Sequence, residues 1–203
     1  VLYRVATLEN FYSVLESTAS EHIHFVFLTG VSKCGKISIF SDLNNLLDIT
    51  LDPRFATIVG YTQKELEDYF PDRIDELAQR YEMSRPDMLA LIARWYNGFS
   101  WDGVHTVYVP FSTLVFLEQQ LFSNNWFSTA TPSFLIKLLR ERKIAPYDLD
   151  EISADSKLLD SADVNNINVY SLLFQTGYLT IKNTWLGPTG QIYDLGYPNF
   201  EVA

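Results

Sequence analysis

The stretch HFVFLTGVSKCGKIS, from His24 to Ser38, decides which fold class the sequence suggests. It begins with an almost unbroken apolar run, His24 to Thr29, which is typical of a strand covered on both faces in a parallel sheet. Gly30 and the pair Gly35-Lys36 then give the spacing G-x-x-x-x-G-K of a phosphate-binding loop. The next residue, Ile37, lacks the hydroxyl that such a loop normally offers to magnesium.

Two further observations argue against a phosphate-binding loop. The residues after Lys36 are Ile37-Ser-Ile39-Phe, and this β-branched alternation is a poor start for the helix that must follow such a loop. Downstream of Ser41, no buried parallel-type strand is followed by the acidic residues that hold the metal. The loop spacing therefore predicts no working nucleotide site by itself.

Size and charge limit the function classes. The chain has 203 residues, 47% of them hydrophobic, and a net charge of −10, which describes one ordinary domain or two small ones with a sizeable core. The one basic cluster is Lys137, Arg140, Arg142 and Lys143. These residues end a predicted helix, where cations stabilise the negative end of the dipole; phosphate binding is the alternative.

The single cysteine, Cys34, excludes an internal disulfide and a cysteine-built zinc site, which suits a reducing cytoplasm. No apolar run approaches the roughly 20 residues of a membrane span, and the N-terminus has no signal pattern. We therefore expect a cytoplasmic protein without membrane contact. Because the chain begins with Val, we also expect a piece of a longer protein.

Sequence patterns divide the chain into three regions. Residues 1–45 contain a predicted helix at Thr7–Ala19 and the apolar strand, which is the order of an α/β layer. Residues 46–150 are mostly amphipathic helices with a short strand near 105–109. Their predicted helical segments are one after the capping box Thr62–Glu65, then Asp72–Tyr81, one starting at Ser84 and stopped at Gly98, Ser112–Leu121 and Thr131–Arg142.

The third region, residues 151–203, combines a helix with a hairpin. Val169–Gly177 predicts a short helix, and Tyr178–Lys182 and Gln191–Leu195 predict strands joined by the turn residues of Leu186–Gly190. This order fits a winged-helix-like module. The preceding stretch Asp148–Asp163 is predicted as an acidic connector. The expected fold class is therefore mixed α/β and rich in helix.

Eight segments in order resemble one known family, the bacterial AAA-ATPase-like proteins, from about residue 9 to 202. The segments are FYSVL, HFVFLTGVSK, ISIFSDLNNLLDITLDPRFATIVGYTQKEL, RWYNGFSWDG, VYVPFS, WFSTATPSFLIKLL, LLFQTGYLTIK and DLGYPNFEV. In this family, a P-loop ATPase module is often followed by a nuclease-like domain. The resemblance implies that the true phosphate loop and acidic magnesium strand lie upstream of this chain and that the nuclease-like domain lies downstream.

The resemblance also assigns roles. The chain would be the back half of an ATPase module: the last strand of a P-loop core sheet, a helical lid and a winged-helix-like end. ATP and magnesium would belong to the parent protein, with none expected on this chain alone. Its first partner would be the missing N-terminal half of that module.

By the same resemblance, Thr29 takes the place of a sensor, a polar side chain at a strand end that contacts the γ-phosphate or the attacking water. Lys33 and Lys36 are candidate contacts to phosphate or a partner. The alternatives are a structural cap at Thr29 and solvated charges at the lysines. The family pattern has an aromatic residue and a serine where this chain has Cys34 and Gly35, which leaves the loop geometry open.

Other chemistry-bearing residues have ordinary explanations. His22 and His24 would share a strand face, but no third metal ligand is evident, so no metal site is expected. The carboxylates of the helical region are interpreted as solvated helix faces and turns; they are Asp52, Asp68, Asp72, Asp75 and Glu76. Its aromatic residues Trp95, Tyr96 and Trp101 are interpreted as part of the core. A redox role for Cys34 is not expected.

Two functions follow. The first is an AAA-like switch, in which this chain supplies the sensor strand and lid while the missing part supplies the phosphate loop. The second is a stand-alone module without nucleotide chemistry that binds a protein or a nucleic acid.

Overall fold

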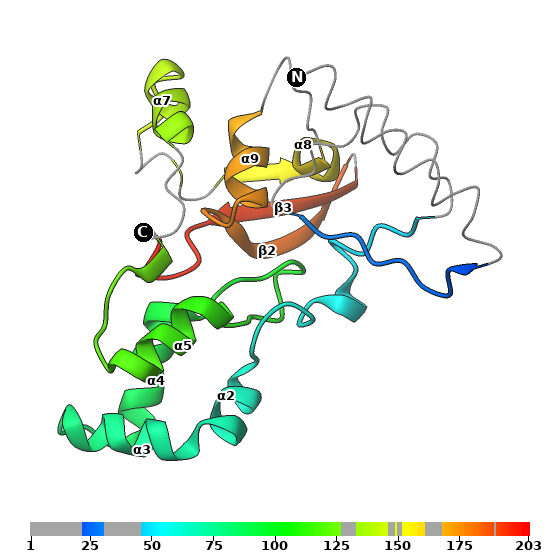
Figure 1. Cartoon of the computed structure of the whole chain (residues 1–203). Helices are drawn as coiled ribbons and strands as arrows, with labels where there is room; N and C mark the ends of the chain where they lie inside the picture. Colours follow the sequence, from blue (N-terminus) through cyan, green and yellow to red (C-terminus); the bar gives the residue numbers. More distant parts are fainter. Residues whose placement is uncertain are drawn as a thin grey trace.

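The computed structural model describes residues 22–30, 46–126, 133–145, 149, 152–160, 168–188 and 190–203. The described chain is a mixture of helices and one small antiparallel sheet, which confirms the mixed α/β class. Helices α2 to α5 gather at one end, and the sheet with α7, α8 and α9 lies at the other (Figure 1). We call residues 46–126 the helical unit and residues 133–203 the C-terminal unit.

The helical unit begins with a short 3-10 helix, Pro53–Phe55, and continues with four α-helices. These are α2 (Gln63–Tyr69), α3 (Pro71–Arg80), α4 (Arg85–Tyr96) and α5 (Pro110–Gln119). The predicted capping box is present, because the Thr62 side chain accepts from the Glu65 N–H and the Glu65 carboxylate accepts from the Thr62 N–H. Ser84 caps α4 and Pro86 lies in its first turn, as the sequence predicts.

The core of the helical unit is formed by one apolar face of each helix. Its fully buried members include Leu66 of α2, Ile74 and Leu77 of α3, and Tyr96 of α4. Each of these side chains has a relative exposure of 0%. The apolar spacing identifies the buried faces only in part, because Tyr69, which follows the same spacing as Leu66 in α2, is 64% exposed. Burying such a side chain stabilises the fold by about 1.5–3 kcal/mol.

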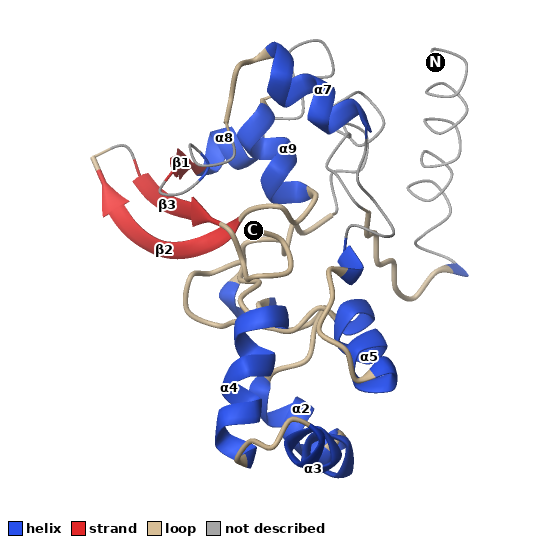
Figure 2. Cartoon of the chain, turned by 90° about the vertical axis from the view of Figure 1, so that its left-hand side faces the viewer, coloured by secondary structure: helices blue, strands red, loops and turns tan. Residues whose placement is uncertain are grey.

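The C-terminal unit contains α7 (Ser133–Glu141), β1 (Ile152–Asp155), α8 (Ser156–Asp160), α9 (Val169–Gln175), β2 (Thr180–Gly187) and β3 (Gly190–Gly196). The strand order is β1-β3-β2, and both pairings are antiparallel. Helices α8 and α9 lie on one side of the curved sheet (Figure 2). The predicted helix and hairpin are confirmed, with strands that reach closer to the turn than expected.

Strand β1 and helix α8 correct the prediction of an acidic connector at Asp148–Asp163. Only Ala154 of β1 is buried, so the strand carries too little apolar pattern to be recognised from sequence. It forms because residues 152–155 pair with 192–195 of β3. The remaining residues of the predicted connector are described only in part.

The buried strand predicted at His24–Thr29 is not observed. These residues belong to no strand, and Phe25 and Phe27 are 79% and 50% exposed. A strand needs hydrogen-bonding partners along its edges, and no described residue pairs with this run. The predicted helix at Thr7–Ala19 and the cap at Thr131-Pro132 lie outside the described residues.

The short strand predicted near 105–109 is reduced to two isolated bridges. Tyr61 pairs with Tyr108, and Phe99 pairs with Val107, both antiparallel. These bridges place Val107 in the core of the C-terminal unit and Tyr108 in the core of the helical unit. The loop of residues 97–109 therefore connects the two cores.

Candidate functional site

The sequence places its candidate site in the segment after His24. Thr29 is exposed at the end of the apolar run, and Gly30 beside it has nothing within 4 Å of the position a Cβ would take. Lys33 and Lys36 lie outside the described residues. Between described residues, no hydrogen bond or ion pair involves the Thr29 side chain, and the sensor role stays a prediction.

The two histidines of this segment, His22 and His24, are both exposed. Among the described residues, no group of three or more His, Cys, Asp or Glu side chains could hold a metal ion. In the same residues, no helix is both long and apolar enough to cross a membrane.

The candidate carboxylates of the helical region take part in ion pairs and caps. Asp52 caps the 3-10 helix and lies 2.6 Å from the Arg54 guanidinium, while Asp68 pairs with Lys64 and Asp75 with Arg85. Glu76 pairs with Arg73 at 2.9 Å. The interpretation of these residues as solvated helix faces agrees with the structure. Tyr96 is fully buried and Trp95 and Trp101 are partly buried, as expected for core aromatics.

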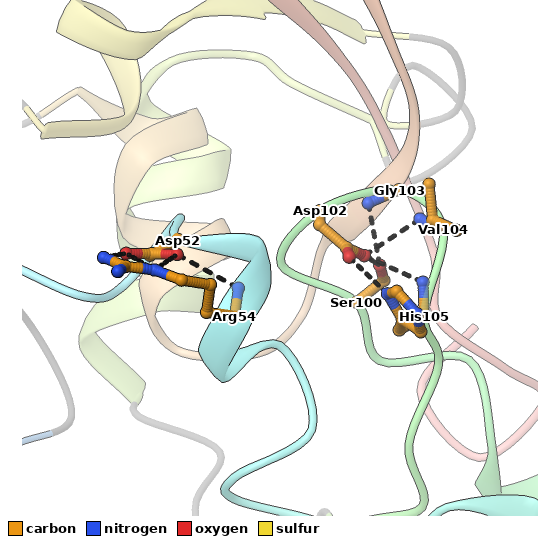
Figure 3. Close-up of polar contacts among 7 residues, drawn as sticks. All are labelled: Asp52, Arg54, Ser100, Asp102, Gly103, Val104 and His105. Atoms are coloured by element: carbon orange, nitrogen blue, oxygen red, sulfur yellow. Dashed lines mark hydrogen bonds and ion pairs between the residues drawn. The ribbon is translucent and has the colours of Figure 1, made fainter.

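A compact polar network surrounds Asp102 in the loop of residues 97–109 (Figure 3). Asp102 Oδ1 accepts hydrogen bonds from the backbone N–H groups of Val104 at 2.9 Å and His105 at 2.8 Å. Its Oδ2 lies 2.6 Å from His105 Nδ1. Ser100 Oγ donates to Oδ1 at 3.2 Å and accepts from the Gly103 N–H at 2.9 Å.

This network holds Asp102 in its charged form. Burial by itself raises the pKa of the Asp102 carboxyl, but the hydrogen bonds from the His105 ring and from two backbone N–H groups outweigh it and keep that pKa below its ordinary value. The side chain of Asp102 is 5% exposed, whereas that of His105 is 57% exposed. The carboxylate therefore fixes the loop from inside and orients the imidazole toward solvent.

The same loop contacts the start of β2. Thr180 Oγ1 accepts from the Ser100 N–H at 2.7 Å and donates to the Ser100 carbonyl at 2.9 Å. This pair satisfies both backbone groups of a buried residue, as a strand partner would. It joins the helical unit to the C-terminal unit across 80 residues of sequence.

A second connection comes from residues 197–203 at the C-terminal end. The N–H groups of Phe200 and Glu201 donate to the carbonyls of Arg94 and Trp95 at the end of α4. Asn199 Nδ2 donates to the Asn97 carbonyl at 2.9 Å. We call the loop of residues 97–109 and the segment 197–203 together the junction.

Glu201 is a second buried carboxyl group of the junction, besides Asp102. It has a relative exposure of 0%, and its Oε1 accepts the Trp126 N–H at 2.9 Å. Its Oε2 and the Ser112 hydroxyl are buried without a hydrogen bond of ordinary geometry. Burial raises the pKa of the Glu201 carboxyl, although the backbone N–H of Trp126, the Ser112 hydroxyl and the backbone N–H of Asn125 partly oppose the rise.

Sequence patterns did not single out Asp102, His105 or Glu201. Asp102 precedes Gly103 in a turn-forming dipeptide, which is a weak signal for a side chain that bonds its own loop. Glu201 lies near the end of an apolar segment and gives no local sign that it is buried. Glu201 bonds a residue that is distant in sequence, Trp126. Asp102 bonds the backbone of its own loop, whose geometry depends on the fold.

Comparison with known proteins adds one relative. The chain is 38% identical over 195 residues to the "Uncharacterized protein in vnfD 5'region" of Azotobacter chroococcum mcd 1. The match covers 96% of this chain and 36% of that protein, so the chain spans about a third of its length. No family model matches the chain, and no solved structure matches it significantly.

Proposed function

We propose that the chain is the lid and winged-helix-like end of an AAA-ATPase-like switch, whose phosphate loop and acidic metal strand belong to another part of a longer protein. The observation that carries the proposal is the order α7, β1, α8, α9, β2, β3 with the sheet order β1-β3-β2. In a winged-helix-like module, a pair of helices is expected before a β-hairpin. A short first strand is expected to pair with the second strand of that hairpin, as β1 pairs with β3 here.

The junction supports a switching role. Such a lid must transmit a change at the nucleotide to a distant surface, which requires two units that move together. Buried contacts of Ser100, Asn199 and Glu201 connect the helical unit to the C-terminal unit. In this proposal, Thr29 contacts the γ-phosphate only when the rest of the ATPase core is present, and Lys33 and Lys36 add phosphate or partner contacts.

The length of the relative agrees with this division. The match covers 36% of the relative's length. The rest of that protein is long enough for the half of an ATPase module that holds the phosphate loop and for a further domain, such as a nuclease-like one. ATP and magnesium are then ligands of the longer protein. The competing proposal, a stand-alone module that binds a protein or nucleic acid, needs neither ligand.

Calorimetric titration with ATP and magnesium separates the two proposals. The chain itself and the whole Azotobacter relative are titrated side by side. We expect no heat of binding with the 203-residue chain and saturable binding with the whole relative. Micromolar binding by the chain alone would contradict the division of labour. A relative that binds no nucleotide would favour the stand-alone module.

A second measurement tests Thr29. Thr29→Val is made in the longer protein of which this chain is the proposed part, because valine has a similar shape and lacks the hydroxyl. If the residue is a sensor, ATP hydrolysis falls by about 10-fold or more while ATP affinity changes little. Equal loss of affinity and hydrolysis, or no loss at all, would assign Thr29 a structural role.

A further inference from the structure

We propose that the C-terminal end of α7 is a binding site for the phosphate backbone of a nucleic acid, formed by Arg140, Arg142 and Lys143. The site is independent of the proposed ATPase role. It rests on the position of these three side chains and on the contacts of the other cations that the structure describes.

The first observation is that these cations have no partner. Arg140, Arg142 and Lys143 are exposed, and no hydrogen bond, ion pair or ring contact involves their side chains in the part of the chain that the structure describes. The other cations with described side chains are engaged. Their contacts are Arg54–Asp52, Lys64–Asp68, Arg73–Glu76, Arg80–Gln120, Arg85–Asp75, Arg94–Phe200, Lys137–Glu141 and Lys182 with the Pro198 carbonyl.

The second observation is that the backbone holds the three residues close together. Helix α7 ends at Glu141, and the chain then turns back on itself. The Lys143 N–H donates to the Arg140 carbonyl at 3.1 Å, and the Ile144 N–H donates to the Leu139 carbonyl at 3.0 Å. These two bonds close the helix end in a fixed geometry, with Lys143 in the left-handed region at φ 54°.

This backbone does not itself require a cation. Helix α3 ends in the same way, with bonds from Glu82 to Gln79 and from Met83 to Ala78. Glu82, at φ 53°, occupies the position equivalent to Lys143 and carries the opposite charge. The positive charge at the end of α7 is therefore not a consequence of the turn.

The chemistry of the cluster fits closely spaced phosphates. Arginine presents a planar fork that binds two phosphate oxygens at once, and lysine adds a compact charge. Neighbouring phosphates of a nucleic acid strand are close enough to face neighbouring cations of one helix turn. The only carboxylate within the segment Lys137–Lys143 is Glu141, which lies 3.8 Å from Lys137. The remaining cations of the segment stay available in a chain whose net charge is −10.

A lipid surface fits less well. A helix that lies on an anionic membrane needs an exposed apolar face beside its cations. In α7, Leu139 packs against the core of the C-terminal unit and so is used inside the protein. Among the side chains of α7 that the structure describes, Ile136 is the one exposed apolar residue, at 40%, so the described part of the helix presents no such face. A nucleic acid requires no apolar face.

Fluorescence anisotropy with labelled duplex DNA and labelled single-stranded RNA, each about 20 nucleotides long, tests the site. The native chain is expected to bind at least one of them at low salt, with log K falling against log salt with a slope of about −2 to −3, as three phosphate contacts require. The variant R140Q/R142Q/K143Q is expected to lose about 10-fold or more in affinity. The matched control R54Q/K64Q/R73Q removes the same charge from paired, exposed positions and should stay within about 2-fold of the native chain.

Several outcomes would overturn the proposal. These are no binding to either nucleic acid, an affinity that does not depend on salt, and an equal loss in the variant and its control. Binding to phosphatidylserine vesicles or polyglutamate in place of nucleic acid would assign the cluster to a lipid or an acidic protein. If the variant loses thermal stability but binds as the native chain does, the three cations only stabilise the helix end. Far-ultraviolet circular dichroism checks that both variants are folded.

Discussion

At the scale of single residues, the junction depends on side chains that are small or buried. Gly98 has a positive φ of 106°, and a Cβ there would lie 2.1 Å from the Pro198 carbonyl oxygen. Two chain segments, one from each unit, can therefore approach only because residue 98 has no side chain. The sequence suggests a helix stop at this glycine, but its contact with Pro198 belongs to the tertiary fold.

We expect Gly98→Ala to destabilise the chain by about 2–4 kcal/mol, because it combines backbone strain with a clash against backbone. Gly190→Ala is the matched control, since Gly190 also has a positive φ, 126°, but has nothing within 4 Å of its Cβ position. Urea unfolding of both variants separates the two effects. If Gly98→Ala and Gly190→Ala lower the free energy of unfolding equally, the close contact between residue 98 and Pro198 does not contribute to the loss of stability.

Glu201 gives a second prediction at this scale. Burial raises the pKa of the Glu201 carboxyl above the ordinary 4.5. The folded chain therefore binds the proton of this carboxyl more tightly than the unfolded chain does. The stability that this provides is complete below pH 4.5 and is lost as the pH rises through the raised pKa. Glu201→Gln cannot ionise and retains an oxygen for the Trp126 N–H, so its stability relative to the native chain should increase from pH 4.5 to neutral pH.

Thermal unfolding at a series of pH values measures this difference. Glu118→Gln removes one charge from an exposed side chain of α5 and controls for the change in net charge. A difference between E201Q and native that is constant with pH, or that falls as the pH rises, would contradict the raised pKa. Glu201→Ala should cost about 1–3 kcal/mol, because it removes the Oε1 acceptor of the Trp126 N–H.

At the scale of elements, the sequence is informative wherever an element is defined by its own pattern. The capping box at Thr62 and Glu65, the Ser84 cap and the hairpin strands are all present. Strand β1 is different, because its pattern is short and it is formed by pairing with β3. The segment His24–Thr29 has a strong strand pattern but no partner among the described residues, which shows that pattern alone does not make a strand.

The loop of residues 97–109 supplies the prediction at this scale. Hydrogen bonds keep the pKa of the Asp102 carboxyl below 3.8, so its contribution to stability is present above pH 3.8 and is lost as the pH falls through the lowered pKa. Asp102→Asn is expected to destabilise the chain by about 1–3 kcal/mol at neutral pH, because an amide group cannot replace the acceptor that faces the His105 ring. The loss should shrink in acid.

Urea unfolding from neutral pH to below pH 3.8 checks this expectation. Asp52→Asn is the matched control, since Asp52 also caps a short loop element and bonds an exposed cation, Arg54. Asparagine caps as well as aspartate does, and an exposed ion pair contributes about 0–1 kcal/mol. If the two variants lose the same stability, the Asp102 network does not stabilise the loop beyond an ordinary cap.

At the scale of the whole molecule, the described surface carries apolar side chains that nothing covers. Phe25 and Phe27 stack on each other with ring centroids 6.5 Å apart, and Leu28 beside them is 37% exposed. Contiguous exposed apolar side chains of this kind favour association. In the proposed longer protein, this segment is where the chain would meet the rest of an ATPase core.

We expect the chain to self-associate through this segment when studied alone. Sedimentation velocity at increasing protein concentration should show association in the native chain and a clear reduction in Phe25→Ser/Phe27→Ser. Leu186→Ser, at an 80% exposed position in the turn end of the hairpin, is the control for loss of exposed apolar surface elsewhere. A native chain that stays monomeric, or a control that is as effective as the double variant, would contradict this assignment.

The sequence by itself determined the helices of the helical unit, the caps at Thr62 and Ser84, the helix α9 and the strands of the hairpin. These features depend on residues within a few positions of one another, whose spacing records which side faces the core. Only the tertiary structure decided that β1 joins the sheet, that Gly98 meets Pro198, that Glu201 is buried beside Trp126 and that the cations at the end of α7 pair with none of the described residues. Each of these depends on contacts between residues far apart in the chain, and such contacts leave no periodic signal in the sequence.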